Sequence, residues 1–155
     1  MVGTVRGFVL GCVLIAAVLA AEPAQAGWRV DRAKQIAEIV WHHPCAGRVT
    51  VSVASTPVVD GVEADGAATI STCSIVLNAR RHWSWLTTCY VVLHEYGHLA
   101  GFRDPGNVAD PLHSSNPASV MWAGGDPYWD NRCASRGRLF LSRHRVERGY
   151  TPTWP

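Results

Sequence analysis

The chain has 155 residues, which is the length of a single domain. Its composition is 48% hydrophobic and 17% charged, and its 14 glycines and 9 prolines are too few for a disordered chain. The formal net charge of +2 excludes a strongly polyanion-driven partner such as nucleic acid as a first expectation.

The first 26 residues have the pattern of a secretory signal peptide. Arg6 precedes an uncharged apolar run over residues 7–21, and Ala24-Gln25-Ala26 provides a small-x-small cleavage site. The apolar run is shorter than the about 20 residues that span a bilayer comfortably. We therefore expect cleavage after Ala26, one domain over residues 27–155, secretion, and no stable membrane insertion afterwards.

A helix and several strands are expected at the start of this domain. Apolar residues at helical spacing predict a helix over residues 32–41, with Asp31 as its N-cap. Alternation predicts a half-buried strand over residues 48–55, and β-branched residues predict one or two strands over residues 69–77. Three carboxylates lie in the turn-rich segment between them: Asp60, Glu63 and Asp65. Their spacing matches no established calcium loop, so calcium binding is a weaker alternative to a solvated turn.

The second half of the domain combines helices with a long loop. Residues 86–100 keep the strongest helical spacing, and Gly101 is suited to end that helix. Residues 102–128 are rich in turn-forming residues, and later apolar positions predict a last helix over residues 131–148. This order of elements indicates an α+β fold.

The strongest chemical motif lies in the helix predicted over residues 86–100. His94-Glu95-Tyr96-Gly97-His98 fits H-E-x-x-H. Residues four apart project from one helix face, so His94 and His98 can occupy two corners of a zinc tetrahedron. Glu95 lies beside that face, where its carboxylate can accept a proton from a water whose pKa zinc has lowered. Chance produces this pattern in roughly 1% of chains of this composition.

Two further residues follow at a spacing that suits a metal site. Gly101 can turn the chain sharply out of the helix, so that another ligand returns to the metal. Asp104 follows six residues after His98, where either Asp or His can serve as a ligand. The spacing therefore favours Asp104 as the third zinc ligand.

Residues 94–122 resemble the metzincin zinc endopeptidases. His94 to Asp104 reads H-E-x-x-H-x-x-G-x-x-D, similar to the small secreted bacterial proteases of the snapalysin type, whose third ligand is Asp. HSSNPASVM, from His113 to Met121, is similar to the segment that follows the third zinc histidine in matrixins. In that second alignment His113 is the third ligand and Met121 is the Met-turn residue. Asp104, His113 and a shell that contains both stay open as alternatives.

The resemblance implies a fold and an activity. The fold is a small α+β zinc protease domain with a twisted, mostly β sheet, an N-terminal helix, an active-site helix, a Met-turn and a C-terminal helix. The activity is hydrolysis of peptide bonds by a water bound to one catalytic Zn²⁺ and activated by Glu95. The peptide would pair with an edge strand such as residues 73–77, and residues 122–128 would form a pocket wall.

The implied partners are a protein or peptide substrate and a proteinaceous inhibitor, and a monomer is expected. The alternative function is a secreted zinc-binding regulatory module without proteolytic activity. Glu95 argues against it, because a structural site needs no base and usually fills all four positions with protein ligands.

Loss of residues 1–26 would leave four of the five cysteines. An even number in a small exported domain predicts two disulfides. Four cysteines allow three pairings, and among them we expect Cys89–Cys133 and Cys45–Cys73.

Overall fold

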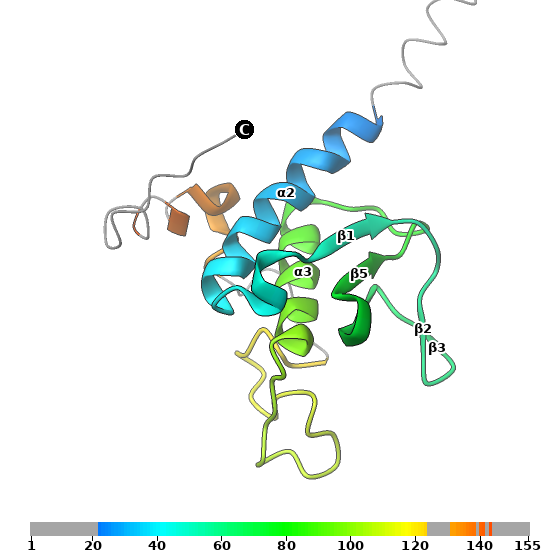
Figure 1. Ribbon diagram of the computed structural model, residues 1–155, viewed down its shortest axis with the longest axis vertical. Coiled ribbons are helices and arrows are strands. Elements are labelled where there is room, and N and C mark those ends of the chain that lie inside the picture. The colour runs from blue at the N-terminus through cyan, green and yellow to red at the C-terminus, as the bar shows by residue number, and fades with distance from the viewer. Residues whose placement is uncertain (1–21, 124–130, 139, 142, 144–155) are drawn as a thin grey trace, which may run out of the picture.

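The computed structural model describes residues 22–123, 131–138, 140, 141 and 143 (Figure 1). In chain order, its helices and strands are α2 (Glu22–Val40), β1 (Thr50–Val53), β2 (Val58–Val59), β3 (Val62–Glu63), β4 (Gly66–Thr69), β5 (Ser74–Leu77) and α3 (Trp85–Leu99). Short 3-10 turns cover Pro44–Gly47, Ile70–Thr72 and Ala134–Gly137. The fold is therefore mixed α+β, as expected. In the part of the chain described, no helix is long and apolar enough to cross a membrane.

Helix α2 begins at Glu22, so the start expected at residue 32 is wrong and Asp31 lies inside the helix instead of capping it. Pro23 is tolerated in the first turn, where the missing N–H costs no intrahelical hydrogen bond. The expected core face is present: Ala33, Ile36 and Ala37 are fully buried.

A three-stranded sheet forms in the order β1-β5-β4. Strand β5 pairs in parallel with β1 and antiparallel with β4. Residues 69–77 thus form the end of one strand, a 3-10 turn and a second strand. Because β5 is the central strand, the expectation that residues 73–77 offer a free edge to a peptide is wrong.

Strands β2 and β3 form a hairpin within the turn-rich segment. Asp60 (φ 51°) and Gly61 (φ 80°) lie at its tip, both with positive φ. This is the geometry that an Asp-Gly type I′ turn requires. The segment's other two carboxylates are occupied: Glu63 accepts a hydrogen bond from the Asn78 amide, and Asp65 pairs with Arg81. Nothing in this geometry gathers the three carboxylates around a calcium ion.

Helix α3 contacts α2 as well as strands β4 and β5 (Figure 1). The Ser84 side chain caps its start by accepting a hydrogen bond from the Thr87 N–H (3.1 Å). At its end, Gly101 has φ 76°, and the N–H of Phe102 donates to the carbonyl of Gly97. These contacts form a Schellman motif, which needs the left-handed conformation that glycine adopts without strain.

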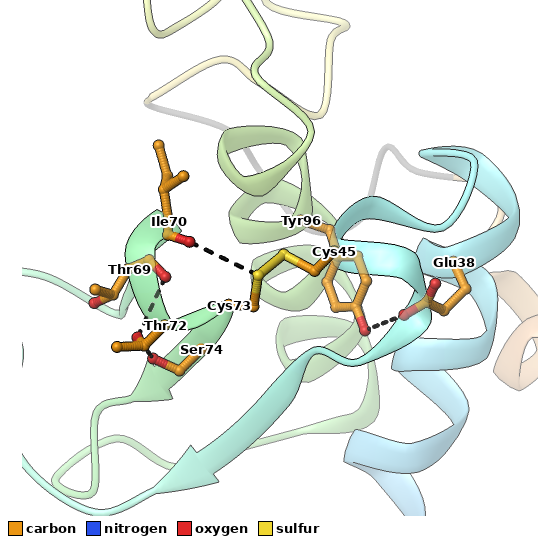
Figure 2. The surroundings of a disulfide bond; sticks show 8 residues. All are labelled: Glu38, Cys45, Thr69, Ile70, Thr72, Cys73, Ser74 and Tyr96. Atoms are coloured by element: carbon orange, nitrogen blue, oxygen red, sulfur yellow. Dashed lines mark hydrogen bonds between the residues drawn. A yellow bond between two sulfur atoms is a disulfide. The ribbon is translucent and has the colours of Figure 1, made fainter.

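Polar contacts and disulfides fasten the helices to the rest of the fold. The buried Tyr96 hydroxyl donates to Glu38 of α2 (2.8 Å), close to the Cys45–Cys73 disulfide (Figure 2). The second disulfide joins Cys89 of α3 to Cys133. Both disulfides are the pairs expected from the sequence.

The C-terminal part of the chain departs from the expected helix over residues 131–148. Residues 131–137 form turns, with Ser135 and Arg136 at positive φ. Helical conformation appears at Arg138 and at the described residues that follow it, and the rest of the expected helix lies outside the described residues. Most of the expected pocket wall, residues 122–128, lies outside them too.

Candidate metal centre

Three histidines from two segments converge at one end of α3. His94 and His98 lie on the helix, and the loop that follows Gly101 brings His113 back to them. The nitrogen atoms that these residues offer lie within 4.8 Å of one another. Within the described residues this is the one group of three or more His, Cys, Asp or Glu that could hold a metal ion.

The spacing of the three rings fits a single ion. The ring centroids are 4.9 Å apart for His94 and His98, 5.1 Å for His94 and His113, and 5.0 Å for His98 and His113. Three imidazoles bound tetrahedrally at zinc–nitrogen distances near 2.05 Å would place their centroids about 5.2 Å apart and their nitrogens about 3.3 Å apart. The Nε2 atoms of His94 and His98 are 3.2 Å apart. The group is therefore compact enough to hold one metal ion.

Two of the rings are oriented by hydrogen bonds from Nδ1. His94 Nδ1 is 2.8 Å from the carbonyl oxygen of Val120. His113 Nδ1 is 2.6 Å from the Asp110 carboxylate. A carbonyl and a carboxylate only accept, so Nδ1 carries the proton in both rings and, in a neutral ring, Nε2 keeps the lone pair that binds a metal.

Burial favours the neutral form of the two helix histidines. It lowers the pKa of His94, although the bond to Val120 opposes the shift. Burial and the neighbouring imidazoles lower the pKa of His98 to about 4. A neutral imidazole is the form that binds a metal, so protons compete weakly with a cation here.

Glu95 lies between α3 and the sheet. Its side chain is buried, at 6% exposure, and its carboxylate accepts a hydrogen bond from the backbone N–H of Ala68 in β4. Burial raises the pKa of Glu95 to about 7, and the bond from Ala68 opposes that rise. A carboxyl group with a pKa near neutrality can both accept and release a proton.

Asp104 is not part of the three-histidine group. One of its carboxylate oxygens accepts from the N–H of Gly106 (2.9 Å), and the other accepts from the N–H and hydroxyl of Ser115 (2.8 and 3.1 Å). These bonds lower the pKa of Asp104. In this structure Asp104 fastens the loop that carries His113, and it is His113 that joins His94 and His98.

Met121 packs against the part of α3 that carries His94 and His98. It is fully buried, and its side chain packs against Gly97, which lies between His94 and His98 in the chain. Its carbonyl accepts from the N–H of Ser114, next to His113. Met121 thus links the two segments that carry the histidines, which suits the floor of a metal site.

Sequence reasoning missed two groups of the site. The Val120 carbonyl has no side-chain signature, because any residue supplies one. Asp110 precedes His113 by three residues, a spacing at which a turn can join a carboxylate to an imidazole, and this Asp-x-x-His pattern was the available signal.

The fold and the site together define a mixed α+β domain with a three-histidine group that could hold a metal ion. No protein family model, no curated protein and no solved structure matches the chain. The resemblance to metzincins is therefore carried by the motif residues alone.

Proposed function

We propose that this protein is a secreted zinc-dependent endopeptidase. The observation that carries the proposal is the position of Glu95, a buried carboxylate next in the chain to a histidine of the three-histidine group and hydrogen-bonded to strand β4. Imidazole nitrogens suit zinc, as they also suit copper, iron and nickel, and three protein ligands leave a coordination position open for chemistry. The two disulfides favour an oxidising compartment outside the cytosol.

The outer edge of β4 is the proposed binding strand for a peptide. The N–H of Asn78 donates to the carbonyl of Asp65, so these two residues form a hydrogen-bonded pair just beyond the ladder of β4 and β5. Such pairs alternate along an antiparallel ladder, so Gly66 and Ala68 direct their backbone groups away from β5. The Ala68 N–H donates to Glu95 on that outer side, so this carboxylate lies beside the edge at which we propose that a peptide adds as a strand.

Glu95 is the proposed general base and acid. A bound zinc ion supplies Lewis acidity, which polarises a peptide carbonyl and lowers the pKa of a water molecule. The Glu95 carboxylate accepts the proton of the attacking water and returns it to the leaving nitrogen. The wall of β4 beside Glu95 limits access of bulk water to this carboxylate.

The test combines metal content with cleavage of an unfolded polypeptide such as reduced, alkylated casein. We expect one zinc per chain and proteolysis that a chelator abolishes. Glu95→Gln should keep the zinc and lose activity by about 10²–10⁴-fold, the usual contribution of a general base. Glu63→Gln is the matched control, because it makes the same chemical change at a hairpin carboxylate.

Three outcomes separate the candidate functions. Zinc binding with proteolysis that depends on Glu95 supports the peptidase. Zinc binding without cleavage of any polypeptide, with Glu95→Gln unchanged, supports the regulatory module instead. A protein that binds no stoichiometric zinc contradicts both functions.

A further inference from the structure

We infer that Asp110 is a positioning residue of the metal centre, and that its carboxylate holds the His113 ring in the tautomer and orientation that present Nε2 to the ion. The inference rests on the three-histidine site and does not require that the protein cleave peptides. It concerns a residue that the metzincin resemblance does not single out.

The three ligands are supported differently. His94 and His98 lie on a packed helix, so the backbone fixes where each ring starts. His113 lies in a loop, where the chain itself gives much less restraint. Its ring is fixed by the bond of 2.6 Å from Nδ1 to Asp110, with the exposed fraction of the side chain at 24% for His113 and 48% for Asp110.

Backbone contacts hold Asp110 in register with His113. The N–H of His113 donates to the carbonyl of Asp110 (3.1 Å), which forms a tight turn between the two residues. Asn107 clamps the turn at both ends, because its Oδ1 accepts from the N–H of Asp110 (3.3 Å) and its Nδ2 donates to the carbonyl of His113 (3.0 Å). The carboxylate therefore meets Nδ1 through a turn of defined geometry.

The chemistry of the bond determines what Asp110 does. A carboxylate cannot donate a hydrogen bond, so it stabilises the tautomer with the proton on Nδ1. It also raises the electron density of the ring and thus the basicity of Nε2 toward a cation. Partners of this kind change metal affinity by about 10–100-fold when they are removed.

The first measurement is the His113 tautomer, read by nitrogen NMR of the metal-free, full-length protein at neutral pH. We expect the Nδ1–H tautomer in the wild-type protein. In Asp110→Ala the Nε2–H form should become populated, whereas Asp110→Asn should keep the Nδ1–H form because its amide oxygen still accepts. A wild-type His113 that is mixed between tautomers would overturn the inference without any variant.

The second measurement is zinc affinity, from competition with a chromophoric chelator. We expect a loss of about 10–100-fold in Asp110→Ala and a smaller loss in Asp110→Asn. Asp65→Ala is the matched control, because it removes a carboxylate of the same charge that pairs with Arg81 and is not part of the three-histidine group. The zinc affinity of Asp65→Ala should stay within about twofold of that of wild type. Equal affinities for Asp110→Ala and wild type, or equal losses in Asp110→Ala and Asp65→Ala, contradict the inference.

The two proposals fail in different ways. Absence of proteolysis in every assay leaves both measurements unaffected, so it counts only against the peptidase. If Asp110→Ala does not fold, as judged by circular dichroism, the wild-type tautomer and the Asp110→Asn affinity decide the question.

Discussion

The side chain of Met121 occupies the space into which any side chain on Gly97 would project. A methyl group built at position 97 would overlap the Met121 sulfur and would lie 2.9 Å from both its terminal carbon and Cζ2 of Trp41. Gly97 stands between the two helix histidines, so the second variable position of the H-E-x-x-H motif is under a steric constraint. The close approach of α3 to the floor of the metal centre depends on this glycine.

The first prediction is that Gly97→Ala destabilises the protein. Helix propensity alone would favour alanine by about 1 kcal/mol, whereas overpacking costs about 1–3 kcal/mol. We expect the overlap to prevail and the free energy of unfolding in urea to fall. Removing the sulfur should relieve part of the overlap, so Gly97→Ala should be less destabilising in a Met121→Ala background. A gain in stability from Gly97→Ala alone would contradict the packing described here.

The second prediction separates the two candidate third ligands. His113→Ala should lower zinc affinity by more than the about 100-fold that the loss of an outer partner can cause, because a ligand itself is lost. Asp104→Asn should have a much smaller effect, since Asp104 holds the loop through Gly106 and Ser115. The exposed His82 provides the control, and His82→Ala should bind zinc as wild type does. The opposite ranking of His113→Ala and Asp104→Asn would show that Asp104 is the ligand.

The third prediction concerns the pH dependence of stability. In the folded protein, the hydrogen bonds to Asp104 lower its pKa below the ordinary value of 3.8. A group with a lowered folded pKa stabilises the fold above its unfolded pKa and loses that contribution as the pH falls through the folded pKa. Wild type should therefore melt above Asp104→Asn at pH 7, and the difference should shrink below about pH 4. Melting curves of metal-free protein at several pH values test this, and a difference that grows with acid would contradict it.

The fourth prediction compares the two disulfides. The chain-entropy model assigns about 3.6 kcal/mol to a loop of 28 residues and about 4.0 kcal/mol to one of 44. Cys89 and Cys133 are also fully buried, whereas Cys73 is half-buried at the end of the Ile70–Thr72 turn. Replacing Cys89 and Cys133 by alanine should therefore lower stability more than replacing Cys45 and Cys73. Unfolding in guanidinium measures both, and a larger loss from the second pair would contradict this order.

Periodicity and motif spacing predicted the parts of this molecule that local chemistry determines. Helix α3 lies almost where its spacing placed it, because Ser84 caps one end and Gly101 closes the other. Helix α2 begins earlier than expected. Asp31 was expected to cap the helix, but an aspartate can also lie inside a helix, and here it does. The hairpin was missed because its strands are two residues long, although Asp60-Gly61 indicates the turn.

Long-range pairing could not be predicted in the same way. Nothing in residues 73–77 shows that β5 lies between two other strands, because strand order depends on partners distant in the chain. Spacing favoured Asp104 over His113 for a similar reason. Counting from His98 assumes that the next suitable residue in the chain is the one that meets the helix histidines. Instead, the loop that Asp104 stabilises through Ser115 continues to His113, and His113 is the residue that meets them.

The Cys89–Cys133 bond closes a covalent ring that contains every residue assigned to the site on α3 and its loop. His94, Glu95, His98, His113 and Met121 all lie between the two cysteines. A single backbone cut anywhere in that ring leaves the two pieces joined, so one nick in the exposed loop cannot release His113 from the helix. A chain cut there would migrate as one species on a non-reducing gel and as two after reduction. The three histidines would thereby stay together after a cut that separates an unbridged chain.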